Sequence, residues 1–260
     1  MWVYRTGKLY DAGAIVLYEY QKTRNTSHPR EFLKEYRGIC VTDGYQVYHT
    51  LEKEREDLLI AGCWSHARRQ FADVVKSLGK EKAKETLAYQ ALNQIGAIFK
   101  LEEAYALLSP DERVRCRQSS TKPLVEAFFA WIRVNQDKVM PKSATGKGFS
   151  YCLNQEKYLK VFLEYGSVPA DNNAAEQAIR GFCIGKRNWH LIDTIHGAQA
   201  SAILYSIAET AKANGLKPYH YFEYLLTEIP KHMEDKDKSF LEHLLPWSPE
   251  LPSECRKTIT

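Results

Sequence analysis

Short apolar segments alternate with helix-like sequence over the first sixty residues, and this alternation constrains the fold more than any other feature of the chain. Strands that are separated by helices pair in parallel in the sheet of an α/β protein. Residues 38–42 and 58–63 fit this pattern and are predicted to be parallel strands. Residues 2–5 and 14–20 flank a glycine-containing loop, which predicts an antiparallel hairpin. Ser27 is the expected N-cap of a short helix between the two pairs.

From residue 64 to residue 165 the sequence pattern is helical. Ser109 and Glu112 form a capping box around Pro110, which marks a helix start. The arginines within 113–117 are interpreted as part of a solvated helix face. This long segment is therefore predicted to be an all-helical insertion into the α/β pattern. Its predicted buried faces are mostly apolar and consist of Leu87, Ala91, Ile95, Ile98, Glu102 and Tyr105, and of Leu124, Phe128, Trp131 and Ile132.

Two further helices are predicted towards the C-terminus. The first ends at Gly215, which suits the C′ position, and the second ends at Pro230. Apolar residues within 240–247 are expected to dock as a small anchor. The predicted buried faces consist of Ala200, Ile203, Leu204, Ile207, Ala208 and Ala211 in the first helix, and of Tyr221, Phe222, Leu225, Leu226 and Ile229 in the second.

The composition excludes several classes of protein. With 44% hydrophobic and 26% charged residues, the chain is typical of globular proteins, and no apolar stretch approaches the roughly 18 residues of a membrane helix. The N-terminus lacks the pattern of a signal peptide, so we expect a cytoplasmic protein without membrane contact. The six cysteines have no repeated spacing and are expected to be reduced thiols. The net charge of +4 permits nucleic-acid binding but does not require it.

Asp43 is the first residue of chemical interest. It follows a predicted parallel strand, and open α/β sheets bind their ligands at the carboxyl ends of such strands. The Asp43-Gly44 pair is also a common turn sequence. The local sequence therefore leaves two interpretations open, a turn residue and a metal-binding carboxylate.

A second candidate lies in the segment 171–180, where three consecutive Asx residues precede a predicted helix. Glu176 and Arg180 are four residues apart and would form an exposed ion pair on that helix. Glu176 is equally suited to hold a divalent cation beside a phosphate, because Mg²⁺ prefers a few carboxylates together with water and substrate oxygens. Both interpretations stay open.

The segment after this helix, 185–190, is expected to be a loop. Lys186, Arg187, Asn188 and Trp189 combine two cations, an amide and an indole, which would suit phosphate contacts and base stacking. A solvated basic loop is the alternative interpretation.

Cys63 and His66 are spaced as a Cys-x-x-His pair. A structural zinc site needs four ligands, and no second pair with suitable spacing exists in the sequence. The pair is therefore interpreted as a structural joint where a strand becomes a helix.

Taken in order, these segments resemble the C-terminal part of transposases of the IS-sixty-six family of bacterial insertion sequences. The resemblance extends over nearly the whole chain. It is carried by ordered motifs at 42–45, 62–71, 141–143, 151–155, 171–180, 185–189, 210–215 and 244–247.

The resemblance implies an α/β fold with an RNase H-like core, a large all-helical insertion and a small helical C-terminal element. Residues 1–63 and 171–215 would form the two parts of the core, with 64–170 as the insertion and 216–260 as the C-terminal element. The implied activity is DNA transposition, in which a DDE triad with two Mg²⁺ ions cleaves and transfers DNA strands.

The resemblance also implies roles for individual residues. Asp43 matches the second carboxylate of the triad and Glu176 the third, so both would be catalytic metal ligands. The implied DNA-binding residues are Arg180, Lys186, Arg187, Asn188 and Trp189, and the implied structural residues are Cys63, His66, Asn172 and Asn173.

In the family, the first aspartate lies on the central strand of the sheet, upstream of the strand that matches residues 2–5. This chain begins after that strand, and Asp11 lies in the predicted hairpin loop, where it cannot substitute. We therefore expect an inactive chain, which would be a fragment, a decayed copy or one product of a split gene. Its expected partners are DNA and an oligomer or full-length transposase.

Two other functions are compatible with the sequence. The first is a DNA-binding protein without catalysis that interferes with an intact transposase. The second is an inert helical protein with a structural zinc ion at Cys63 and His66.

Overall fold

The computed structural model describes residues 1–10, 13–189 and 192–257, which form two compact units. The terminal unit combines Met1–Thr23 with Ala174–Thr260, and the central unit is Arg24–Asn173. Asp11, which the sequence predicts in the hairpin loop, lies outside the described residues. The described chain is mostly helical with one two-stranded sheet in each unit, which confirms the predicted α/β class at this level.

The terminal unit begins with the predicted antiparallel hairpin. Strand β1 has the predicted bounds, strand β2 is shorter than the predicted 14–20, and Arg5 lies opposite Val16 in their register. The elements of this unit are β1 (Trp2–Arg5), β2 (Val16–Glu19), α9 (Asn173–Trp189), α10 (Ile195–Ala213), α11 (Pro218–Glu228) and the 3₁₀ segments Ile229–His232, Ser239–Leu244 and Ser253–Cys255.

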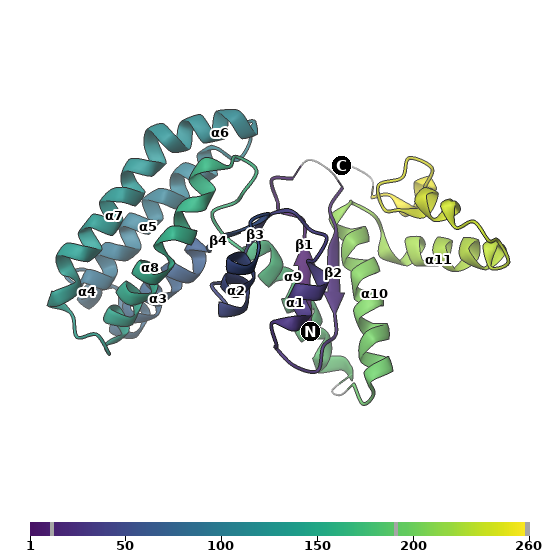
Figure 1. Ribbon diagram of the computed structural model, residues 1–260, viewed down its shortest axis with the longest axis horizontal. Helices are drawn as coiled ribbons and strands as arrows, with labels where there is room; N and C mark the ends of the chain where they lie inside the picture. The colour runs from purple at the N-terminus through teal and green to yellow at the C-terminus, as the bar shows by residue number, and fades with distance from the viewer. Residues whose placement is uncertain (11–12, 190–191, 258–260) are drawn as a thin grey trace. The chain divides into compact units, whose positions relative to one another are not determined.

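Helix α10 lies along the free edge of β2 (Figure 1) and hydrogen-bonds it through short polar side chains. The Tyr18 amide donates to Ser206 Oγ at 2.8 Å, and the Val16 amide donates to Thr210 Oγ1 at 3.0 Å. The Thr210 hydroxyl donates in turn to the Val16 carbonyl at 3.0 Å. Ser206 and Thr210 are four residues apart on one helix face, and they face alternate residues of the strand. An edge of unpaired backbone groups is thereby covered.

The buried face of α10 differs from the prediction. The predicted apolar residues Ile203 and Leu204 are 61% and 54% exposed, whereas Ala198, Ala202 and Thr210 are buried. Small side chains allow the helix backbone to approach β2 closely, and the hydroxyl groups replace the missing strand partner. Of the predicted face, Ala211 is buried, and Ala200 is exposed.

The C-terminal part of the terminal unit follows the predicted helix ends. Gly215 has φ +73° and follows Asn214, the C-cap of α10, which confirms its C′ position. The predicted anchor contributes the buried Leu244, which packs with Leu225, but Trp247 is 43% exposed. The prediction that Leu226 of α11 is a core residue is wrong, because its side chain is 73% exposed.

The central unit contains the predicted parallel strand pair followed by the helical segment. Gly38 lies opposite Leu58 and Val41 opposite Ala61 in this pair, and no ladder joins it to β1 or β2 within the described residues. The elements are α1 (Ser27–Phe32), β3 (Gly38–Val41), α2 (Gln46–Glu54), β4 (Leu58–Ala61), α3 (Trp64–Leu78), α4 (Lys80–Ala83), α5 (Leu87–Ala104), α6 (Pro110–Cys116), the π-helical segment Arg117–Thr121, α7 (Lys122–Asn135), the 3₁₀ segment Gln136–Lys138, α8 (Ala144–Lys160) and the 3₁₀ segment Val161–Glu164.

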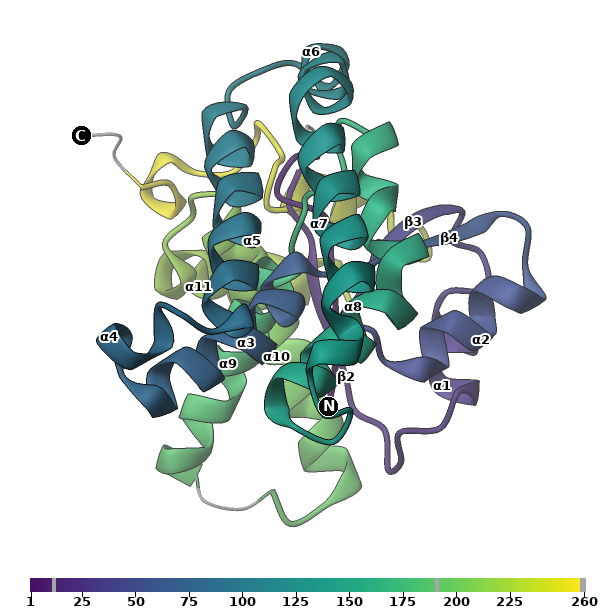
Figure 2. The same cartoon turned by 90° about the vertical axis from the view of Figure 1, so that its left-hand side faces the viewer.

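Helices α3, α5, α7 and α8 pack around one apolar core (Figure 2). Trp64 lies in this core, with its ring 5.6 Å from the ring of Phe128 and its indole nitrogen donating to the Leu159 carbonyl at 2.8 Å. The predicted stripe through Ala91, Ile95 and Ile98 is fully buried, as are Phe128 and Ile132, whereas the predicted core residue Leu124 is 39% exposed.

The prediction that the arginines within 113–117 lie on a solvated helix face is wrong for Arg113 and Arg117. Arg113 is 4% exposed and Arg117 is 0% exposed. Arg113 donates to the carbonyls of Tyr105, Leu108 and Gly166, at 2.5–3.2 Å. Both guanidinium groups are buried because they find carbonyl or carboxylate acceptors inside the unit.

The helix starts were predicted with mixed success. Ser109 and Glu112 form the expected capping box at the start of α6. Ser27 is the first residue of α1 rather than its N-cap, because Thr26 occupies the cap position in a helical conformation.

Among residues 1–10, 13–189 and 192–257, no helix has both the length and the apolar character that crossing a membrane requires.

Candidate functional site

Asp43 lies in the central unit, two residues after the end of β3 and three residues before the start of α2. The Tyr45 amide donates to Asp43 Oδ1 at 3.1 Å, and Gly44 adopts φ +87°, a conformation that favours glycine. Asp43 is therefore a turn residue at the carboxyl end of a parallel strand. Its side chain is exposed, and Oδ2 has no hydrogen-bond partner among the described residues.

Two residues of α8 support this turn. The Tyr151 hydroxyl donates to the Asp43 carbonyl at 3.3 Å, and Gln155 Oε1 lies 3.2 Å from the point where a Cβ on Gly44 would be. Tyr151 and Gln155 are four residues apart and share one helix face. Burial raises the pKa of Tyr151, so its hydroxyl stays protonated as a donor. Residues 151–155 are one of the motifs that carry the family resemblance, but the sequence alone assigns them no role. The four-residue spacing of Tyr151 and Gln155 is the signal that could have identified them as a pair on one helix face.

Several buried polar atoms near this turn have no partner within the described residues. They are Thr42 Oγ1, next to Asp43 in the chain, Gln155 Oε1 and His49 Nε2. The His49 ring stacks on Tyr158 with centroids 4.0 Å apart, and burial lowers the pKa of His49 so that the ring is neutral near pH 7. Most of the polar atoms near Asp43 that have no hydrogen-bond partner among the described residues are oxygen atoms. Hard oxygen donors of this kind fit a divalent cation such as Mg²⁺.

Glu176 lies in the first turn of α9, in the terminal unit. Its side chain is 21% exposed, and Oε2 lies 3.9 Å from Arg180 Nη2, at the limit of an ion pair. Arg180 is 69% exposed. The predicted i,i+4 pair is therefore present but loose, and such a pair is worth at most about 0.5 kcal/mol. Asp43 belongs to the central unit and Glu176 to the terminal unit.

The Asx residues before α9 organise the segment that enters the helix. The Asn173 amide donates to Asp171 Oδ1 at 2.9 Å, and this bond forms an Asx turn. The Asn172 amide donates to Cys63 Sγ at 3.1 Å. The segment 171–173 is thus held in the central unit by the cysteine thiol.

Cys63 lies where β4 ends and α3 begins, as predicted. It is fully buried, and burial raises the pKa of its thiol, so the sulfur accepts the Asn172 amide as a neutral group. His66 lies in the first turn of α3, and its amide donates to the Cys63 carbonyl at 3.1 Å. These contacts join the strand, the helix and the segment before α9.

The loop predicted at 185–190 is wrong for residues 185–189, because α9 continues to Trp189, and residue 190 lies outside the described residues. Gly185 is buried inside the helix and does not end it. Arg187 and Asn188 are exposed. Lys186 and Trp189 lie within α9, but their side chains are outside the described part of the structure. Glu176, Arg180 and Arg187 follow at steps of four and seven, which is one side of a helix.

Comparisons with known proteins agree with this arrangement of motifs. Residues 1–200 match the family model described as Transposase IS66 family, and residues 206–247 match the model described as IS66 C-terminal element. No solved structure matches the chain.

Three similar curated proteins come from Sinorhizobium fredii, and all are named as uncharacterized. Protein y4jD is 28% identical over 236 residues, which cover 89% of this chain and 45% of the relative. Proteins y4hP and y4qI are each 28% identical, covering 89% and 90% of this chain and 43% of each relative. The chain thus spans a little under half the length of these relatives. With both family models matched in order over residues 1–200 and 206–247, the chain belongs to the IS66 transposase family.

Proposed function

We propose that this chain forms part of the DNA-cutting core of a transposase, with Asp43 and Glu176 as two of its catalytic carboxylates. The observation that carries the proposal is the position of Asp43 at the carboxyl end of β3 with an uncommitted carboxylate oxygen. Membership of the IS66 transposase family supports the reaction class. Residues 1–63 and 171–215 would be the two parts of an RNase H-like core, with 64–170 as its helical insertion and 216–260 as the C-terminal element.

The chemistry of this site would be DNA strand cleavage and transfer by phosphoryl transfer. Asp43 and Glu176 would hold two Mg²⁺ ions, which would supply activation of the attacking oxygen and stabilisation of the leaving oxygen. Asp43 would hold metal through the oxygen that the Tyr45 amide leaves uncommitted. Glu176 would hold metal from the first turn of α9, where the partial positive charge of a helix N-terminus favours a charged carboxylate. Tyr151 and Gln155 would fix the turn that carries Asp43.

DNA would lie along the exposed side of α9. Arg180 and Arg187 are exposed on the same side of this helix as Glu176, and Asn188 is exposed next to them. Guanidinium groups bind phosphate oxygens through paired hydrogen bonds, so the two arginines would position the strand without reading its sequence.

The isolated chain is expected to leave DNA uncut, because the family resemblance assigns only two of the three carboxylates to residues 1–260. The measurement is nicking of supercoiled plasmid by the purified 260-residue chain in Mg²⁺ or Mn²⁺. Plasmid that stays supercoiled agrees with the proposal. Nicking that disappears in Asp43→Ala would mean that the chain holds a complete site, and this part of the proposal would then fail.

A DNA-binding protein without catalysis is the second candidate function, and the exposed Arg180 and Arg187 favour it. Such a protein would bind DNA with the same salt dependence but would not need Asp43 or Glu176 to bind metal. Metal binding at these carboxylates therefore separates the two functions.

A further inference from the structure

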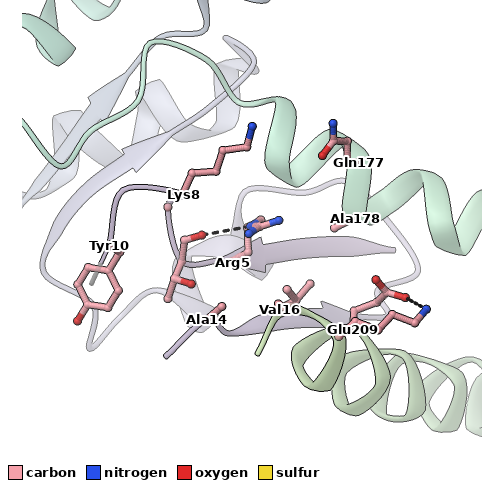
Figure 3. A pocket seen from close by; sticks show the side chains of 12 residues that line it. Arg5, Lys8, Tyr10, Ala14, Val16, Gln177, Ala178 and Glu209 are labelled. Carbon is pink, nitrogen blue, oxygen red and sulfur yellow. Dashed lines mark hydrogen bonds and ion pairs between the residues drawn. The ribbon is translucent and has the colours of Figure 1, made fainter. Parts of the chain in front are cut away.

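The terminal unit contains a cavity of about 490 Å³ between the β1–β2 hairpin, α9 and α10 (Figure 3). Its charged lining consists of three cations, Arg5, Lys8 and Lys212, and one carboxylate, Glu209. Lys212 Nζ lies 2.7 Å from Glu209 Oε1, so these two charges neutralise each other. The positive charges of Arg5 and Lys8 remain, and the cavity is therefore suited to an anion.

Arg5 is held in a fixed position at the wall of the cavity. Its Nη1 donates to the Ala174 carbonyl at 3.1 Å, and its Nε donates to the Thr6 carbonyl at 3.1 Å. Nη2 has no acceptor within the described residues. A guanidinium that is anchored by two carbonyls keeps its remaining N–H donors oriented, which reduces the entropy lost when an anion binds.

Lys8 and Gln177 supply the other donors. Lys8 is exposed at the rim, and neither its ammonium nor the Gln177 amide has a hydrogen-bond partner in the described part of the chain. Figure 3 shows both side chains on the α9 side of Arg5. A guanidinium, an ammonium and an amide together match the oxygens of a phosphodiester. Tyr10, 58% exposed, also lines the cavity, where a base could stack on its ring.

We propose that this cavity, named the Arg5 pocket, binds a backbone phosphate of the DNA strand on which the enzyme acts. The inference rests on the proposed function, because it identifies the ligand as a nucleic-acid phosphodiester. Gln177 directly follows Glu176 in α9, so a strand held in the Arg5 pocket would lie beside the helix turn that carries the proposed catalytic carboxylate. The pocket would thereby fix the position of the strand along α9.

The test measures binding of a fluorescein-labelled single-stranded oligonucleotide to the full chain by fluorescence anisotropy over a range of salt concentrations, with EDTA present. Lys8→Gln is expected to weaken binding about tenfold at low salt and to make the plot of log affinity against log salt shallower by about 0.7. Gln177→Leu removes a neutral donor, so it is expected to weaken binding without changing the slope. Lys22→Gln, an exposed lysine of the same unit, is the matched control and should change neither quantity.

Two results would overturn the proposal. The first is a Lys8→Gln variant that matches Lys22→Gln in affinity and slope. The second is a pocket that holds free phosphate only: inorganic phosphate would then raise the melting temperature of the unmodified chain but not of Lys8→Gln, while oligonucleotide binding would not depend on Lys8. Because EDTA removes divalent cations, the assay does not depend on a metal at Asp43 or Glu176, and failure of the pocket is distinguishable from failure of the proposed function.

Discussion

Glu102→Ala is expected to lower the free energy of unfolding of the central unit by about 3–5 kcal/mol, since it leaves a buried charge uncompensated. The charge belongs to Arg117, which is fully buried and donates through Nε to Glu102 Oε1 at 3.0 Å. Its Nη1 also donates to the carbonyls of Phe162 and Tyr165, so the guanidinium cannot turn to solvent without breaking further bonds. The measurement is urea unfolding followed by circular dichroism.

Glu103→Ala is the matched control for this prediction. Glu103 is the next residue of α5 and is exposed, so its replacement should change the free energy of unfolding by less than about 0.5 kcal/mol. Equal losses in the two variants would contradict the account, because they would mean that the Arg117 charge does not depend on Glu102.

Thr210→Val is expected to lower the free energy of unfolding of the terminal unit by about 2–4 kcal/mol, since each buried backbone group left without a partner costs about 1–3 kcal/mol. Valine has nearly the shape of threonine but cannot bond to the Val16 amide and carbonyl, which both pair with the Thr210 hydroxyl at 3.0 Å. Thermal and urea unfolding of the purified chain measure the loss.

The same chemical change at an exposed site provides the control. Thr227 lies on α11 in the same unit and is exposed, so Thr227→Val should leave stability almost unchanged. A Thr210→Val variant as stable as Thr227→Val would mean that water, and not α10, covers the edge of β2.

The two largest effects fall on residues whose roles the sequence pattern did not reveal. Glu102 lies on the predicted buried stripe of α5, but the pattern gave no sign that its partner Arg117 would also be buried. Hydropathy classes an arginine as exposed, whereas the fold supplies carbonyls at residues 162 and 165 that only the tertiary structure brings together. For the same reason α10 was predicted to bury Ile203 and Leu204, although it packs its small and hydroxyl side chains on β2.

Features set by local physics were predicted well. The capping box at Ser109, the C′ position of Gly215 and the parallel pairing of 38–41 with 58–61 follow from short-range signals that the structure reproduces. For the candidate site, the position of Asp43 at the end of a strand was predictable. The support of its turn by Tyr151 and Gln155 was not, because more than one hundred residues separate the contacting groups, with a sequence separation of 108 for the Tyr151 bond.

The proposal as a whole depends on Asp43 and Glu176 holding the divalent cations of one site. Fe²⁺ substituted for Mg²⁺, with ascorbate and peroxide, produces hydroxyl radicals that cut the backbone next to the bound ion, and mass spectrometry maps the cuts. We predict two groups of cuts, one around residue 43 and one around residue 176, both suppressed by excess Mg²⁺ and both lost in Glu176→Gln. Cuts around residue 43 that persist in Glu176→Gln, or cuts at neither position, would contradict the account.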